Sequence, residues 1–258
     1  MIGKVSMPDP LTLGAAAAGA AAAKAGESLG VRLTAVAGSM KRAVVDRAVV
    51  AFRLGFETYL TSSYIRCRYF KTVLNPYEPA DLKDSYIRLN LISLGSRNEI
   101  SDKDLFSNFR NGERIVVTGL AGSGKSMLMR YLTLDSFTDL SVGTPLFVEL
   151  RKINDYEEKD LISFIYNECS QKGKSVTRLQ FDLALQHGLF TIILDGFDEL
   201  EYEYREVISE QIVSFERDYP SLKVIVSSRP DDDRFRSWTS FTIYRVSDFF
   251  QGSGSRIN

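Results

Sequence analysis

Histidine and cysteine are scarce in this chain, which has one histidine and two cysteines among its 258 residues. The cysteines, Cys67 and Cys169, belong to no CxxC or Cys/His pattern, so the sequence predicts neither a zinc site nor a disulfide framework. The single histidine, His187, excludes a metal site built on a pair of histidines and argues against a histidine-based catalytic triad. Reduced cysteines fit a cytoplasmic protein, which is the localisation that we expect.

Neither an excess of one charge nor a long apolar run is present. Lys and Arg number 32 against 33 Asp and Glu, a net charge of −1, which gives no overall field to recruit nucleic acid or an acidic membrane. Seven basic residues lie between positions 41 and 71, and we interpret them as a solvated helix face. The longest uncharged stretch of the alanine-rich segment near the N-terminus, Pro10–Ala23, has 14 residues and is too short to span a bilayer. We therefore expect no membrane segment.

The pattern of apolar residues divides the chain into three regions. Residues 1–85 lack strand-like alternation and predict a small helical region, and residues 247–258 predict a flexible Gly/Ser tail. Residues 86–246 alternate strand-like with helical runs, which predicts an α/β three-layer sandwich around a mainly parallel five-stranded sheet. The expected core strands are Ile115–Thr118, Pro145–Leu150, Phe190–Leu194, Lys223–Ser228 and Phe241–Val246, with Tyr86–Ile92 as a further candidate, and the expected helices include Glu158–Gln171 and Glu203–Asp218.

A phosphate-binding pattern follows the first of these core strands. It has the form GxxxxGKS and runs from Gly119 to Ser126, between the strand and a helix. Glycines let successive backbone N–H groups turn toward phosphate oxygens, and the helix adds the positive end of its dipole. We expect Lys125 to reach the β- and γ-phosphates and Ser126 to bind Mg²⁺. The residues predicted to bind the nucleotide are Gly119, Leu120, Ala121, Gly122, Ser123, Gly124, Lys125, Ser126 and Met127.

Three carboxylates lie at the end of the strand Phe190–Leu194. Asp195 follows the strand directly, and Asp198 and Glu199 come after Gly196-Phe197. Open parallel sheets bind ligands at this edge. We expect Asp195 to hold Mg²⁺, directly or through water, and Asp198 or Glu199 to orient or deprotonate an attacking water.

These motifs, together with Val224-Ile-Val-Ser-Ser-Arg-Pro230, resemble the NACHT domain of the STAND class of signal-transducing P-loop ATPases. The specific part is the acidic motif, in which Gly196 follows the aspartate and the acidic pair comes two residues later. The resemblance implies ATP or ADP with Mg²⁺ as ligands and a signalling switch that hydrolyses ATP slowly. It also implies that Asp198 and Glu199 serve the hydrolytic water and that Arg229 is a sensor of the γ-phosphate. A looser similarity, from Phe56 to Ile92, is to bacterial NACHT proteins, many of which act in antiphage defence.

Family members normally continue beyond the last strand into helical and winged-helix domains. The winged-helix histidine that holds ADP in the family has no counterpart here, since His187 precedes the acidic strand. We therefore expect a chain truncated after the nucleotide-binding domain, or a minimal member, that assembles with copies of itself or with a partner protein supplying the missing domains.

Two other functions remain open at this stage. One is a GTPase or nucleotide kinase, although no Asn/Thr-Lys-x-Asp element for guanine follows the acidic strand and Arg229 has a sensor-like context. The other is a nucleotide-binding scaffold without significant turnover, because many P-loop domains need an arginine from another subunit.

Overall fold

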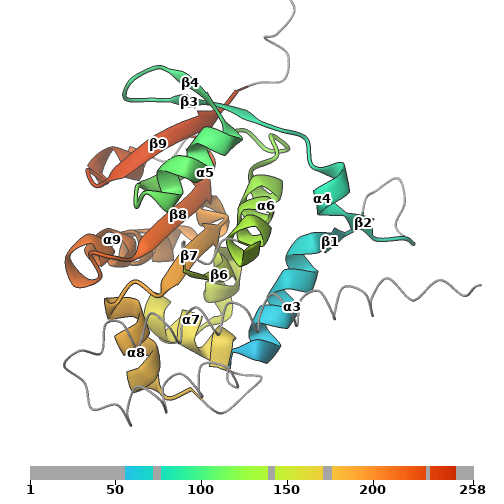
Figure 1. Cartoon of the computed structure of the whole chain (residues 1–258). Coiled ribbons are helices and arrows are strands. Elements are labelled where there is room, and N and C mark those ends of the chain that lie inside the picture. Colours follow the sequence, from blue (N-terminus) through green and yellow to red (C-terminus); the bar gives the residue numbers. More distant parts are fainter. Residues whose placement is uncertain (1–55, 72–76, 139–142, 171–175, 231–232, 248–258) are drawn as a thin grey trace, which may run out of the picture.

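A computed structural model of the protein describes residues 56–71, 77–138, 143–170, 176–230 and 233–247 (Figure 1). The predicted alanine-rich segment, most of the N-terminal helical region and nearly all of the predicted tail lie outside these residues. Within them the main sheet has the strand order β4-β3-β9-β5-β8-β7-β6. The strands, in chain order, are β3 (Asn90–Ser93), β4 (Glu99–Ser101), β5 (Arg114–Thr118), β6 (Thr144–Glu149), β7 (Phe190–Asp195), β8 (Lys223–Ser228) and β9 (Phe241–Val246).

The five predicted core strands are all present and form the parallel part of the sheet, from β9 to β6. The predicted number of five omits a hairpin, because β3 and β4 add to the edge at β9 in antiparallel pairing and make the sheet seven-stranded. Strands β5, β7 and β8 are buried along almost their whole length, as their β-branched and aliphatic runs predict for strands covered on both faces.

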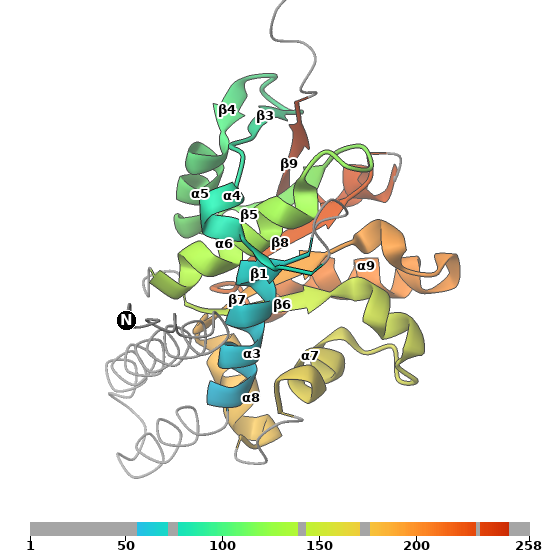
Figure 2. The ribbon, with the colours of Figure 1, turned by 90° about the vertical axis from the view of Figure 1, so that its right-hand side faces the viewer.

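Helices cover both faces of the sheet. Figure 2 shows α5 (Asp102–Arg110) and α6 (Lys125–Thr138) on one side and α9 (Tyr202–Asp218) on the other. Two further helices of the α/β sandwich are α7 (Leu161–Ser170) and α8 (Arg178–Gln186), and His187 is the C-cap residue of α8. The predicted helix Glu203–Asp218 is confirmed as α9, in which Ile208, Ile212 and Phe215 are buried and Val207 is 44% exposed. This arrangement is the expected α/β sandwich.

Helix α3 (Glu57–Arg68) packs against α6 and β6 and shares their hydrophobic core. The Tyr59 hydroxyl donates a hydrogen bond to the carbonyl of Phe147 in β6, at 3.0 Å. Arg66 lies over the Phe147 ring and forms an ion pair with Glu149 at 3.8 Å. A small two-stranded sheet, β1 (Tyr69–Phe70) with β2 (Ala80–Asp81), and the short helix α4 (Leu82–Ser85) connect α3 to the main sheet.

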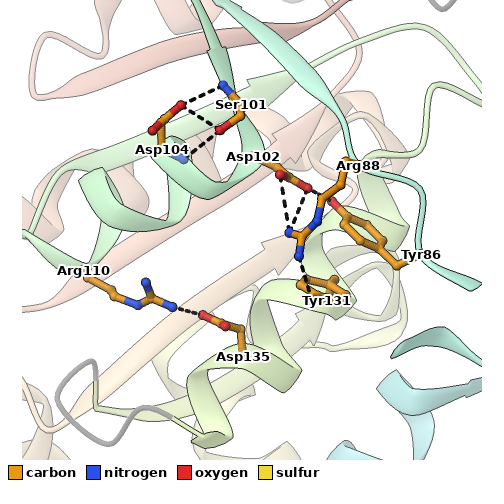
Figure 3. Close-up of polar contacts among 8 residues, drawn as sticks. All are labelled: Tyr86, Arg88, Ser101, Asp102, Asp104, Arg110, Tyr131 and Asp135. Atoms are coloured by element: carbon orange, nitrogen blue, oxygen red, sulfur yellow. Dashed lines mark hydrogen bonds and ion pairs between the residues drawn. The ribbon is translucent and has the colours of Figure 1, made fainter. Parts of the chain in front are cut away.

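The segment that precedes β3 crosses α6 and is held by a buried carboxylate (Figure 3). Asp102, which is fully buried, accepts a hydrogen bond from the Tyr86 hydroxyl at 2.7 Å and faces Arg88 at 3.5 Å. Arg88 also donates to the hydroxyl of Tyr131 on α6, and the Tyr86 and Tyr131 rings stack at 4.0 Å. The apolar pattern predicts a strand that begins at Tyr86, but strand pairing begins at Asn90. The side-chain contacts of Tyr86 and Arg88 explain this difference.

Candidate nucleotide-binding site

Three neighbouring parallel strands bring the predicted site residues to one edge of the sheet. The phosphate loop follows β5, the acidic turn follows β7, and Arg229 follows β8. Register places Val116 in β5 and Leu194 in β7 on either side of Val226 in β8. Because the strands are parallel, their carboxyl ends coincide, so residues that are up to 110 positions apart in sequence become neighbours.

The phosphate loop has the backbone geometry that close approach to an anion requires. Gly122 and Gly124 have φ angles of 76° and 91°, in the left-handed region that glycine adopts without strain. A Cβ at Gly119 would lie 2.6 Å from the Ser123 hydroxyl oxygen, so a larger residue there would force the Ser123 side chain to move. That hydroxyl is buried and has no hydrogen-bond partner within the described part of the chain. An unsatisfied hydroxyl inside a glycine-rich loop at a helix N-terminus suits a phosphate oxygen.

The other predicted loop residues line the start of α6. Leu120 and Ala121 are exposed at the tip of the loop, and the Met127 side chain packs against the hydrophobic core. The Leu128 N–H bonds to the Gly124 carbonyl, so the N–H groups from Lys125 to Met127 precede the first intrahelical bond. We therefore expect Met127 to contribute its backbone and not its side chain.

Lys125 lies between the loop and the acidic turn. Its ammonium nitrogen donates to the carbonyls of Gly119 and Leu120, at 2.7 and 2.8 Å. Burial lowers the pKa of Lys125, and the neighbouring carboxylates of Asp198 and Asp195 oppose that shift. An ammonium that is partly stripped of water and surrounded by acceptors is suited to pair with a polyphosphate.

Ser126 and Asp195 join the phosphate loop to the acidic strand. The Ser126 hydroxyl donates to an Asp195 carboxylate oxygen at 3.2 Å, and Ser227 donates to the same oxygen at 2.5 Å. Ser227 also accepts a hydrogen bond from the Gly196 N–H, which fixes the backbone after the strand. Burial raises the pKa of Asp195, while the hydrogen bonds from Ser227 and Ser126 lower it. A nearby cation would favour the charged form of this carboxylate.

This pair of oxygen ligands fits Mg²⁺ bound together with phosphates. Magnesium in such sites takes one or two protein oxygens and completes its octahedron with phosphate oxygens and water. Within the described residues no cluster of three or more His, Cys, Asp or Glu side chains could hold a metal alone. Ser126 and Asp195 would therefore hold the ion only as part of a Mg–nucleotide complex.

Asp198 and Arg229 form an ion pair over the acidic turn. The Arg229 guanidinium contacts one Asp198 carboxylate oxygen at 2.9 Å, and the Arg229 backbone N–H donates to the other at 3.1 Å. Glu199 is exposed, and the partial burial of its carboxyl raises its pKa, against the nearby Arg151 charge. The turn itself is a 3-10 element, η3 (Phe197–Glu199), that starts after Gly196 with a φ of 82°. The structure thus brings all of the predicted catalytic and metal residues to one place.

Glu149 lies near this site but belongs to no motif, so sequence reasoning missed it. Glu149 ends β6 and pairs in register with Asp195. Burial alone would raise the pKa of Glu149, but Arg66, Lys152 and Arg151 together hold it below the ordinary value. The 3-10 element η2 (Leu150–Asp155) follows and contacts η3. The sequence does place Glu149 in a predicted strand, Pro145–Leu150. It does not reveal the strand order, which is needed to see that Glu149 lies beside Asp195.

The parallel sheet, the glycine loop and the Ser126–Asp195 contact define a nucleotide-binding P-loop NTPase domain. A family model for the NACHT domain matches residues 113–253, more than half of the chain, and the chain belongs to this family. A comparison with curated proteins found no match. Among the described residues, no helix combines the length and apolar character needed to cross a membrane.

Proposed function

We propose that the chain is an ATP-binding, Mg²⁺-dependent signal-transduction switch of the NACHT/STAND type that hydrolyses ATP slowly. The observation that carries the proposal is the hydrogen bond between Ser126 of the phosphate loop and Asp195 of the acidic strand. It joins the two halves of a Mg–nucleotide site, with Lys125 beside them. Membership of the NACHT family supports a signalling role.

Each site residue has a distinct role in this proposal. The loop N–H groups and the Ser123 hydroxyl bind phosphate oxygens, and Lys125 leaves the Gly119 and Leu120 carbonyls to pair with the β- and γ-phosphates. Ser126 and Asp195 hold Mg²⁺, which supplies charge neutralisation for phosphoryl transfer. Asp198 and Glu199 orient and deprotonate the attacking water, and Arg229 contacts the γ-phosphate.

The Arg229–Asp198 ion pair gives a physical reason for slow turnover. While Asp198 is held at both oxygens by Arg229, it is a weak acceptor for a water proton. Arg229 must therefore move to the γ-phosphate before Asp198 acts. The same ion pair favours the alternative of a nucleotide-binding scaffold without significant turnover, if it persists when ATP is bound.

The loose similarity of the segment before the domain to bacterial NACHT proteins extends the proposal to cytoplasmic antiphage defence. In that setting ATP binding would promote self-association or contact with a partner protein. Competition between ATP and GTP for the site tests the GTPase alternative, since the proposal expects ATP to displace GTP. A nucleotide kinase would also bind ATP, so that alternative is tested by transfer of the γ-phosphate to a second nucleotide.

Lys125→Ala tests nucleotide binding directly. Removing the ammonium deletes a charge-assisted contact with the polyphosphate, so we expect the Kd for Mg-ATP to rise about 10-fold or more. Isothermal titration calorimetry gives the two constants. The matched control is Lys103→Ala on α5, where the lysine is exposed. Equal affinity of the wild type and Lys125→Ala for Mg-ATP would defeat the proposal.

A further inference from the structure

Two side chains from outside the motifs hold the backbone of the acidic turn. They are Asn154, in η2, and Arg205, in the second turn of α9. The Asn154 side-chain amide donates to the Glu199 carbonyl at 3.0 Å, and its oxygen accepts from the Glu201 N–H at 3.0 Å. Arg205 donates to the Asp198 carbonyl at 2.6 Å and to the Leu200 carbonyl at 2.9 Å.

These contacts cover the carbonyls of three consecutive residues, from Asp198 to Leu200. A 3-10 element of three residues leaves its last carbonyls without partners inside the element. Here they bond to side chains of two different elements, one on each side of the turn in sequence. The turn is therefore fixed from both sides and not by its own short helix.

Asn154 is itself held in place. Lys159 donates to the carbonyls of Asn154 and Ile153, at 2.6 and 3.0 Å. The ammonium of Lys159 also lies 3.9 Å from the centre of the Tyr204 ring, next to Arg205 on α9. We call the contacts of Asn154 and Arg205 with the turn the clamp. The clamp, together with Lys159, connects η2, the acidic turn and α9 next to the Asp198 and Glu199 side chains.

We propose that Asn154 and Arg205 are positioning residues for ATP hydrolysis, which hold the Asp198 and Glu199 carboxylates at the distance from the γ-phosphate that water activation needs. The inference rests on the proposed hydrolytic function. Neither residue touches the reacting atoms. Because a misplacement of about 1 Å costs on the order of 100-fold in rate, loss of the clamp lowers turnover and spares the phosphate loop, where nucleotide affinity resides.

The test compares Asn154→Ala and Arg205→Gln with matched controls. Asn167→Ala removes a half-buried asparagine of α7 whose amide donates to the hydroxyl of Tyr156, and Arg217→Gln removes an exposed arginine from α9. Single-turnover hydrolysis of Mg-ATP and the Kd of a fluorescent ATP analogue are measured for each. We expect turnover about 10- to 100-fold lower in the clamp variants, with Kd within about twofold of the wild type and both controls unchanged. Arg205→Lys, which keeps the charge and can hold one carbonyl, should lie between Arg205→Gln and the wild type.

Unchanged turnover in both clamp variants would overturn the inference, as would a loss of nucleotide affinity in proportion to turnover. Hydrogen exchange of the Glu201 amide supplies a readout independent of hydrolysis, because its acceptor is Asn154. We expect faster exchange in Asn154→Ala and not in Asn167→Ala. If the wild type binds ATP without cleaving it, the hydrolytic proposal fails. The exchange rate of the Glu201 amide then tests the clamp by itself: faster exchange in Asn154→Ala would support it, and unchanged exchange would contradict it.

Discussion

Arg229 engages Asp198 through both its guanidinium and its backbone N–H, whereas the charge of Arg151 acts on Glu199 and favours its ionised form. The two acidic residues of the turn therefore start from different states. Asp198 is paired and held, and Glu199 is exposed with a raised pKa caused first by partial burial. This difference separates their expected contributions to the reaction.

We predict that Asp198→Asn and Glu199→Gln both keep nucleotide affinity and lose turnover, since each removes a group that acts on the water and none that binds phosphate. Asp198→Asn should also release Arg229, because the neutral amide no longer attracts the guanidinium. The Kd for Mg-ATP and the single-turnover rate are measured together, with the exposed Glu210→Gln on α9 as the control. A variant that hydrolyses ATP at the wild-type rate would remove that residue from the proposed chemistry.

The site residues carried by a contiguous motif were predictable, and those placed by tertiary contacts were not. Lys125, Ser126 and Asp195 follow from the glycine loop and the strand end, since backbone geometry there dictates residue type. Asn154 and Arg205 act through backbone carbonyls, which any donor of suitable length can reach, so no spacing reveals them. Their role depends on η2 and α9 meeting at the turn, which is a property of the strand order.

At the scale of elements, strand β4 and helices α5 and α8 were missing from the prediction, and β3 was anticipated only by the candidate strand Tyr86–Ile92. Both helices begin with capping boxes, Ser101 with Asp104 and Thr177 with Gln180. Those signals are local and were available in the sequence. The hairpin is a different case, because β4 pairs with β3, and β3 joins the sheet by pairing with β9, which is about 150 residues further along the chain.

The segment from Tyr86 to Leu89 links this hairpin to the phosphate loop. Leu89 side-chain carbons lie 3.4 Å from the position that a Cβ of Gly124 would occupy, so the segment packs directly on the loop. Asp102 holds the segment through Tyr86 and Arg88, and its backbone N–H donates to the Leu89 carbonyl. We infer that this contact stabilises both the hairpin and the start of α6.

We predict that Asp102→Ala lowers the free energy of unfolding by about 1–3 kcal/mol, because it leaves the partly buried Tyr86 hydroxyl without its acceptor. Urea unfolding followed by circular dichroism gives the value. Asp84→Ala, which removes an exposed aspartate from α4, is the control and should lie within about 0.5 kcal/mol of the wild type. Equal stability of the two variants would show that the Asp102 cluster contributes nothing to the fold.

At the scale of the whole molecule, our proposal expects the switch to work through self-association or a partner protein. P-loop NTPases often receive an arginine from a neighbouring subunit, which raises the rate by orders of magnitude. The edge of the sheet with the site also carries Leu120 at the tip of the phosphate loop, 59% exposed. We therefore predict that turnover per chain rises with protein concentration.

Hydrolysis rates per chain over a 100-fold concentration range, with analytical ultracentrifugation in Mg-ATP and Mg-ADP, test this expectation. Self-association in ATP and a rising rate would agree with the switch. A rate per chain that stays constant, with a single monomer species in both nucleotides, would contradict self-association and favour the scaffold alternative.

The contact of α3 with β6 has a consequence for solubility. Strand β6 ends the sheet, and an uncovered terminal strand offers its peptide groups to any other extended polypeptide. The Tyr59 hydroxyl occupies the carbonyl of Phe147 at that border, and the Arg66 guanidinium lies above the adjacent ring. Helix α3 thereby covers part of this border, and we expect its removal to make the nucleotide domain more prone to aggregate through β6.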